Sequence, residues 1–473
     1  MRALLTAAFL GLVPAATMAQ ANMASPAAER LRVTTTSEEA SRQFFAGLSD
    51  ARNIFPSRAT THFERAIAAD GSFGLARVFR GAFAPGLTPA ERTAEMDRGI
   101  ASMGGATTGE LVVALALREL PNNQRSRALW ETAAKLLPGD PTVAFYAALA
   151  TPPPGNTAAL RSVTDRFPDD GAAYNVLAYQ LWQQGNREGG FNAVRRYVQL
   201  APDHPNPHDS YAELLQWSGL YAEALAHYGR AVQLDSSFSE GYMGLADVLQ
   251  LTGKGVDARR QVQQAIARAP SKFNAVVSTR ALGRSFLMDG FLKDGMDQLA
   301  AAARDARGMN RNGFAAQTYR EMAIADALLG RGTAVASNLA AAVETSSADD
   351  PQTLTAIVAA QAWSPSGDLA AARQAAQKLA TAARADSQYA NTARVANAIM
   401  LLRDGKPRDA LTALSGAPPD DAMARTLTAE CYVATGNLAD ARTLKNLMLN
   451  DPQLTLENGY NVLARIRAAK IKA

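Results

Sequence analysis

The chain has 473 residues, of which 48% are hydrophobic, 7% are aromatic and 19% are charged. Its 48 basic and 44 acidic residues give a formal net charge of +4, spread as singlets and pairs such as Arg195-Arg196, which argues against a nucleic-acid-binding surface. Cys431 is the single cysteine, so an intrachain disulfide is excluded, and we expect a packed apolar thiol in the last helix pair.

The first 21 residues have the pattern of a secretory signal peptide. Arg2 gives a positive start, residues 3–13 form a short apolar run, and residues 19–21 (Ala-Gln-Ala) match a small-x-small cleavage site. We expect cleavage before Asn22, a flexible segment over 22–36, and a mature protein that is periplasmic or secreted. An ordinary amphipathic N-terminal helix is the alternative. Because no later stretch reaches about 18 uninterrupted apolar residues, we expect no transmembrane segment.

Residues 37–168 are predicted to form degenerate helix pairs. Phe44 and Phe63 fit the two helices of a first pair. Two stretches rich in proline and glycine, 84–107 and 150–156, are predicted to be loops or a joint between subdomains, because both residue types interrupt helices.

Three regular repeats are predicted over 169–270. Gly185, Gly219 and Gly253 are successively 34 residues apart, which is the period of a helical hairpin repeat. Glycine adopts the left-handed conformation without a Cβ clash, so each of the three is expected to end the first helix of a pair and close the turn. The period therefore predicts an array of helical hairpins.

The segment 205–236 resembles the tetratricopeptide repeat (TPR) family. The residues that carry the resemblance are Tyr211, Ala212, Gly219, Tyr221, Ala224, Tyr228, Ala231, Leu234 and Asp235. The resemblance is strong over 171–270 and weaker over the rest of the mature chain. It implies an all-α fold, a right-handed α-solenoid of about a dozen antiparallel helix pairs that forms a TPR superhelix.

Degenerate repeats are expected again over 271–452, followed by a capping helix over 453–473. The turn glycines of this part are Gly290, Gly330, Gly367, Gly405 and Gly436. The last segment mixes apolar and basic side chains. A capping helix needs both, because one side packs against the last repeat and the other faces water.

Signatures of catalysis and of metal binding are absent from the sequence. It lacks a Gly-x-Ser-x-Gly elbow, a phosphate-binding Gly-x4-Gly-Lys loop and a His-Glu-x-x-His zinc helix. His204 and His208 are close in sequence but lie at a turn between repeats, where caps and solvated polar residues are typical. We expect no enzyme activity, no metal and no cofactor. An enzyme whose site lies in the irregular stretch 84–107 is a further alternative.

In the TPR family, the first helix of each pair lines an inner groove that binds extended or helical peptides. The groove-binding candidates that the resemblance assigns are Asn175, Tyr179, Trp182, Asp209, Glu213, Gln216, Trp217, Met243 and Asp247. Aromatic residues often dominate binding energy, and the acids favour a basic or hydrogen-bond-donating partner. Trp182 or Trp217 could instead fill space between repeats.

The resemblance thus implies a non-catalytic scaffold or adaptor of the bacterial cell envelope, with a protein or peptide ligand. The alternative is a periplasmic scaffold that binds polysaccharide in an export system. Aromatic platforms with amide partners would mark such a sugar-binding surface, and Asn175, Tyr179 and Trp182 allow it.

Overall fold

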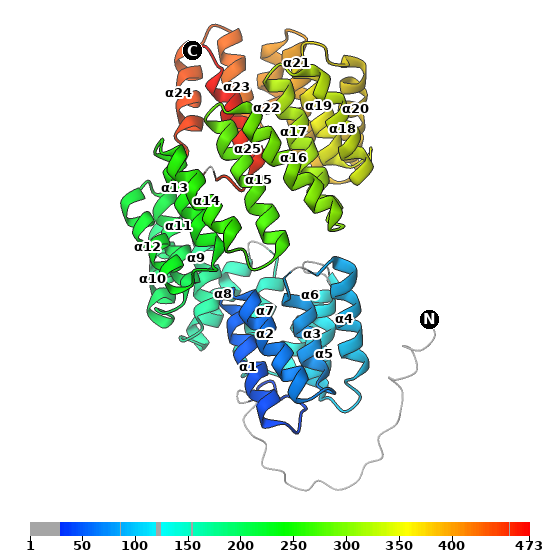
Figure 1. The fold of residues 1–473 in the computed structure, drawn as a ribbon, viewed down its shortest axis with the longest axis vertical. Coiled ribbons are helices and arrows are strands. Elements are labelled where there is room, and N and C mark those ends of the chain that lie inside the picture. The colour runs from blue at the N-terminus through cyan, green and yellow to red at the C-terminus, as the bar shows by residue number, and fades with distance from the viewer. Residues whose placement is uncertain (1–28, 86, 120–123, 153–154, 454) are drawn as a thin grey trace.

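A computed structural model describes residues 29–85, 87–119, 124–152, 155–453 and 455–473. Its regular secondary structure in these residues is entirely helical, and successive helices pair along the chain (Figure 1). The prediction of an all-α solenoid of helix pairs is therefore confirmed. The predicted signal peptide lies outside the described residues.

The N-terminal part contains four helix pairs around a phenylalanine-rich core. The ring of Phe44 lies 5.9 Å from that of Phe63 and 5.2 Å from that of Phe79, between ring centroids. The helices are α1 (Glu38–Arg52), α2 (Pro56–Ala69), α3 (Gly74–Phe83), α4 (Pro89–Ala101), α5 (Thr108–Arg118), α6 (Gln124–Leu136), α7 (Pro141–Ala150) and α8 (Gly155–Arg166).

The prediction of an irregular stretch over 84–107 is wrong in its central part, which is helix α4. The hydroxyl of Thr88 accepts a hydrogen bond from the N–H of Glu91, and the Glu91 carboxylate accepts one from the N–H of Thr88. This capping box fixes the start of the helix, and Pro89 occupies a first-turn position where no N–H is needed. The proline thus begins a helix here.

The regular repeats form three pairs with the predicted turns. Gly185, Gly219 and Gly253 have φ angles of 80°, 75° and 77°, so the expected left-handed turns are confirmed. Ala212 and Ala224 are fully buried, as close helix packing requires. The helices are α9 (Gly171–Gln183), α10 (Arg187–Leu200), α11 (Pro205–Trp217), α12 (Tyr221–Leu234), α13 (Ser239–Leu251) and α14 (Gly255–Ala267).

Five further pairs follow. Four of the five predicted turn glycines have positive φ, whereas Gly367 lies in the turn after Trp363 without one. The helices are α15 (Lys272–Met288), α16 (Leu292–Gly308), α17 (Asn312–Leu328), α18 (Gly332–Thr345), α19 (Pro351–Trp363), α20 (Leu369–Ala385), α21 (Ala390–Arg403), α22 (Pro407–Leu414), α23 (Ala422–Ala434) and α24 (Leu438–Leu449), with a short 3-10 turn at Ser387–Tyr389.

The first helices of the pairs form the inner face of the array. Contacts between first helices of neighbouring pairs join α11 to α13, α13 to α15, α17 to α19, and α19 to α21. Such contacts place these helices on the concave side of a curved stack, as the TPR resemblance implies.

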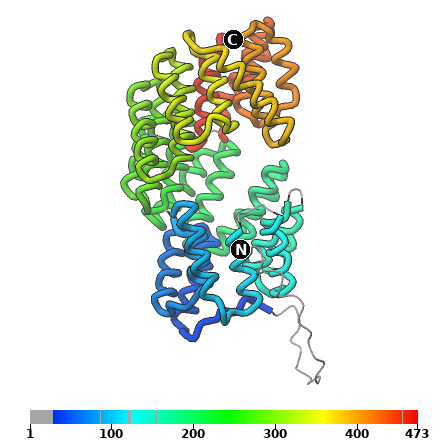
Figure 2. The backbone as a smooth tube through the Cα atoms, turned by 90° about the vertical axis from the view of Figure 1, so that its right-hand side faces the viewer, coloured from blue at the N-terminus to red at the C-terminus, as the bar shows by residue number. Residues whose placement is uncertain are grey.

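The C-terminal segment does more than cap the last pair. Helix α25 (Gly459–Ala469) contacts α23 and α24, but it also contacts α15 and α17 much earlier in the chain. Figure 2 shows this red segment inside the turn of the chain, between the green and the orange helices. Asn458 caps the helix by accepting a hydrogen bond from the N–H of Asn461, so the residues before it stay non-helical and cross the inner face.

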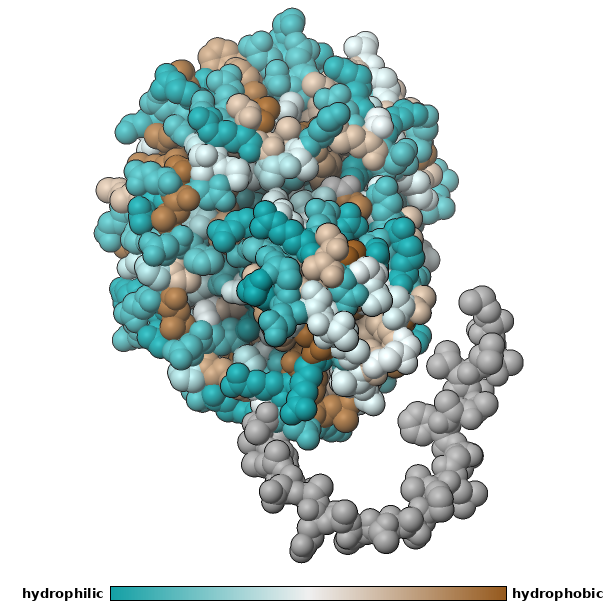
Figure 3. Space-filling view, turned by 60° about the horizontal axis from the view of Figure 1, so that its bottom comes forward, coloured by the Kyte–Doolittle hydropathy of each residue, from teal (hydrophilic) through white to brown (hydrophobic). Residues whose placement is uncertain are grey.

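The outer surface agrees with a packed helical array. Figure 3 shows a face with mainly hydrophilic side chains, on which apolar residues occur in small separate groups. None of the helices in the described residues is long and apolar enough to cross a membrane.

Cys431 is buried on α23, where desolvation and then the nearby Glu430 raise the pKa of its thiol to about 12.

Candidate ligand-binding groove

The predicted groove residues lie on three neighbouring inner helices. Three are on α9 (Asn175, Tyr179, Trp182), four on α11 (Asp209, Glu213, Gln216, Trp217) and two on α13 (Met243, Asp247). Trp182 and Met243 are each only 5% exposed: Trp182 packs against Trp217, and Met243 belongs to the apolar cluster that contains Leu456. Asn175 is also buried, whereas Tyr179, Gln216 and Asp247 bond to other inner helices or to the C-terminal segment.

The aromatic candidates form one cluster that joins α9 to α11. The ring centroid of Trp217 lies 5.8 Å from that of Trp182 and 5.8 Å from that of Tyr179. The Tyr179 hydroxyl donates a hydrogen bond of 2.6 Å to Glu213, and the guanidinium of Arg187 lies over Trp182. The cluster therefore fills space between repeats, and the half-buried Trp217 is the ring that borders a cleft with residues of α24.

A group of carboxylates lines the α11–α13 part of the concave face. Burial and then the neighbouring Glu213 and Glu240 raise the pKa of Asp209 well above its usual range. Burial also raises the pKa of Glu213 and of Asp247. Across the described residues, none of these four acids has an ion-pair partner. We call this part of the face the acidic groove. Its carboxyl groups are therefore either protonated or negatively charged without a cation beside them.

The chain's own residues 452, 453 and 455–457 lie across the acidic groove. Gln216 donates to the carbonyl of Pro452 at 3.1 Å, and the Asp247 carboxylate accepts from the N–H of Leu456 at 2.7 Å. Arg284 donates to the carbonyl of Leu456 at 2.9 Å. Because these three side chains lie on α11, α13 and α15, successive inner helices hold successive main-chain atoms of one segment.

The side chain of Leu456 anchors this segment. It is only 2% exposed and packs in an apolar cluster with Tyr242, Met243 and Leu282. Glu457, the next residue, stays open to solvent, yet the surrounding protein, and then Glu240, raise the pKa of its carboxyl. The groove thus contacts the main chain and one apolar side chain.

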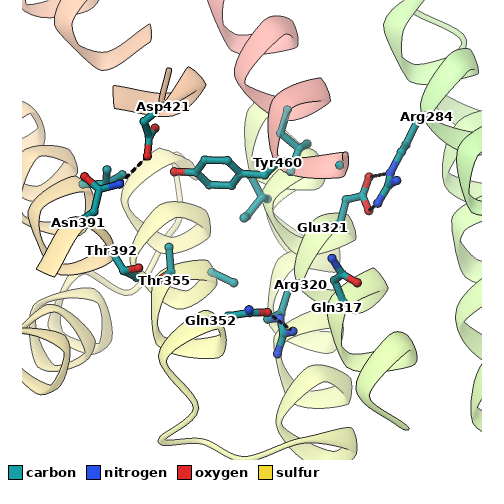
Figure 4. Close-up of a pocket in the computed structure, with 15 residues that line it drawn as sticks. Arg284, Gln317, Arg320, Glu321, Gln352, Thr355, Asn391, Thr392, Asp421 and Tyr460 are labelled. Carbon is teal, nitrogen blue, oxygen red and sulfur yellow. Dashed lines mark hydrogen bonds and ion pairs between the residues drawn. The ribbon is translucent and has the colours of Figure 1, made fainter. Parts of the chain in front are cut away.

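A separate pocket of about 320 Å³ lies farther along the concave face (Figure 4). Its walls come from α17, α19 and α21 and from the start of α25. The Tyr460 ring crosses the pocket with its hydroxyl directed toward Asp421 and Asn391. Ile324, Val395 and Leu463 add apolar surface.

Most of the charged groups that line this pocket are ion-paired within the protein. Arg284 makes a two-pronged ion pair with Glu321, at 2.6 and 2.7 Å, and both side chains are buried. Arg320 donates to Asp350 at 2.8 Å, and Asp421 accepts from the amide of Asn391 at 2.7 Å. Paired charges leave the uncharged groups as the ones free to bind a ligand.

Four uncharged groups remain available in the pocket. The amide oxygen of Gln317 accepts from Arg280 and that of Gln352 accepts from Arg320, each at 2.9 Å, so their NH₂ groups stay free. Within the described part of the chain, the hydroxyls of Thr392 and Tyr460 have no hydrogen-bond partner either. The pocket therefore offers two amide donors and two hydroxyls.

The sequence pattern alone does not reveal these pocket residues. Gln317 and Gln352 are 35 residues apart on neighbouring first helices, much as Gln216 and Gln250 are 34 apart in the regular repeats. That recurrence of amides at the repeat interval is the signal that could have located them. The weak register over 271–452 concealed it.

Comparisons with known proteins bear on the fold alone. Neither a protein-family model nor a curated protein sequence matches the chain. Among solved structures, the chain is similar to a thermophilic TPR protein of Thermus thermophilus, with 21% identity and a TM-score of 0.32 over 38% of this chain and 95% of that one.

Two further solved structures are similar over part of the chain. MamA has 16% identity and a TM-score of 0.27, over 33% of this chain and 88% of that one. YrrB, described as a TPR protein with an unusual peptide-binding site, has 16% identity and a TM-score of 0.28, over 42% of this chain and 98% of that one.

Proposed function

We propose that this protein is a non-catalytic scaffold of the bacterial cell envelope that binds an extended segment of a partner protein in its acidic groove. The observation that supports this most is the way Gln216, Asp247 and Arg284 hold the main chain of residues 452–457. Main-chain groups are common to all peptides, so side chains that bind them can hold a foreign segment in the same way.

The charge of the acidic groove favours one kind of partner. Asp209, Glu213 and Glu240 have no cation beside them in the described residues, and burying such charges costs free energy. A Lys or Arg side chain on the bound segment would lower that cost and speed the encounter. The partner we propose therefore carries basic residues and at least one apolar residue that can occupy the place of Leu456.

The envelope location in this proposal depends on the signal-peptide pattern of residues 1–21. The non-catalytic assignment depends on the lack of catalytic signatures in the sequence. The described residues also contain no group of three or more His, Cys, Asp or Glu side chains that could hold a metal ion.

The first test uses the chain's own segment as a probe. A labelled peptide with the sequence of residues 450–458 is added to the full-length protein and to a Leu456→Gly variant, and binding is followed by fluorescence anisotropy. The variant's own segment has lost its apolar anchor, so we expect the peptide to bind the variant at least about tenfold more tightly than the wild type, which still holds its segment in the groove.

Substitutions in the groove complete this test. Adding Gln216→Ala to the Leu456→Gly variant should weaken peptide binding, because the bond to the Pro452 position is lost. Gln233→Ala, at an exposed position on the second helix α12, is the matched control and should leave binding unchanged. Equal peptide binding by the groove variant and the control would contradict the proposal.

A further inference from the structure

The pocket between α17, α19, α21 and α25 is distinct from the acidic groove and has the dimensions of a small-molecule site. Its volume of about 320 Å³ falls at the lower end of the range for ligand pockets. Inner helices line one side of it and Tyr460 of α25 lies on the other (Figure 4). Such a shape suits a compact ligand.

The charges of the pocket favour an uncharged ligand. Arg284, Arg320 and Asp421 already have partners in Glu321, Asp350 and Asn391. A charged ligand would have to replace these contacts or be buried without a counter-charge, and both cost free energy. An uncharged ligand leaves the existing pairs intact.

The free polar groups favour a ligand that donates and accepts hydrogen bonds at several positions. The NH₂ groups of Gln317 and Gln352 can only donate, whereas the hydroxyls of Thr392 and Tyr460 can do both. The carboxylate of Asp421 adds an acceptor beside Tyr460. A polyhydroxylated ring matches this mixture, because each of its hydroxyls is both a donor and an acceptor.

The apolar part of the pocket completes the match. The flat Tyr460 ring provides a surface for the C–H face of a sugar ring, next to Ile324 and Val395. Helix α25 closes the side toward α15, so an extended chain that followed the acidic groove would meet Gly459 and Tyr460 before it reached the pocket. This closure disfavours a continuous peptide strand and favours a compact ring or a chain end.

We propose that this pocket binds a neutral saccharide, one or two sugar rings in size, through the amides of Gln317 and Gln352 and the ring of Tyr460. The site is separate from the peptide groove, so the protein would hold a sugar and a protein segment on two parts of one concave face. It also gives the polysaccharide alternative of the sequence analysis a location other than Asn175, Tyr179 and Trp182.

The test is isothermal titration of the full-length protein with maltose, cellobiose, lactose and N,N′-diacetylchitobiose, and with capped trialanine as the peptide probe. We expect at least one disaccharide to bind and trialanine not to compete with it. The double substitution Gln317→Ala, Gln352→Ala should weaken sugar binding about tenfold, because two hydrogen bonds are lost. Both glutamines are exposed, so the fold should tolerate the change.

Two further variants keep the result decisive. Gln377→Ala, at an exposed position on the second helix α20, should bind the sugar as the wild type does. If the double variant fails to fold, Thr392→Val takes its place. It removes one hydroxyl with little change in shape and should weaken binding severalfold. The proposal is overturned if no disaccharide binds, if the pocket variants bind the sugar as tightly as Gln377→Ala, or if trialanine displaces it.

Discussion

Two parts of one concave face satisfy their polar side chains in different ways. On α11, α13 and α15, the polar groups of Gln216, Asp247 and Arg284 bond to the main chain of residues 452–457, more than 170 residues away. On α17 and α19, Gln317 and Gln352 each accept a hydrogen bond from an arginine of the preceding inner helix. The same repeat architecture therefore produces a surface for main chain in one part and a pocket with free uncharged groups in the other.

The electrostatics of the two parts differ as well. Burial raises the pKa values of Asp209, Glu213 and Asp247 in the α11–α13 part, and these acids have no cation beside them in the described residues, whereas Arg284 and Arg320 at the pocket are neutralised by Glu321 and Asp350. A groove whose carboxylates have no nearby cation favours a positively charged partner. A pocket whose charges are mostly ion-paired favours a neutral ligand. Arg284 belongs to both parts, because it holds Leu456 and also pairs with Glu321.

Because Arg284 belongs to both parts, its replacement should cause the greatest loss of stability. The side chain is 1% exposed, and Arg284→Met would leave the Glu321 carboxylate buried without a partner. We expect a loss of about 3–5 kcal/mol in the free energy of unfolding, measured by chemical denaturation. The double variant Arg284→Met, Glu321→Met should recover much of it, because no buried charge is left unpaired.

Arg373→Met is the matched control for this change. Arg373 pairs with Asp404 on the surface, where water already solvates both groups, so its loss should alter stability little. Equal effects of Arg284→Met and Arg373→Met would show that the buried pair does not hold the two parts together.

The acidic groove should make stability depend on pH through Asp209. Its pKa in the fold is raised above the unfolded value, near 3.8, by burial and by neighbouring carboxylates. Its contribution to stability is thus fully present below about pH 3.8 and is lost as the pH rises through the raised pKa. The asparagine of Asp209→Asn cannot ionise, so this variant should be more stable than the wild type near pH 8. The difference should be roughly 1.4 kcal/mol for each unit by which the fold raises the pKa of Asp209.

Chemical denaturation at pH 4, 6 and 8 measures this difference. The gap between Asp209→Asn and wild type should grow from near zero at pH 4 to its full size at pH 8. Asp305→Asn, at an exposed position on the second helix α16, should give a gap that stays constant. A constant gap for Asp209→Asn as well would mean that its carboxyl is not desolvated in the fold.

Local signals explain why the helix pairs could be predicted and the C-terminal path could not. Turn glycines such as Gly219 and caps such as Asn186 act within a few residues, so a repeat interval reveals them. The contact of Leu456 with Asp247 joins residues far apart in sequence and has no period. Sequence pattern therefore located the inner helices but not the segment that lies on them.

The same reasoning explains the mixed outcome for the candidate site. Gln216 and Trp182 have the same repeat phase and are both buried, but Gln216 bonds to the segment that crosses the concavity, whereas the large ring of Trp182 fills the gap beside Trp217. Phase determines the direction of a side chain, and its size and its neighbours determine what it contacts. The pocket residue Tyr460 comes from α25, which belongs to no repeat, so no phase could place it.

Replacing one glutamine from each part should change stability by smaller amounts that differ between the two parts. Gln216 is 1% exposed and joins the carbonyl of Pro452 to the hydroxyl of Tyr228, so Gln216→Ala leaves two polar groups without a partner and should cost about 1 kcal/mol. Gln352 is exposed, and Gln352→Ala should change stability by less than about 0.5 kcal/mol. Thermal unfolding of the two variants measures the difference. If Gln352→Ala cost as much as Gln216→Ala, the pocket amide would have a structural role, and its NH₂ group would not be free for a ligand.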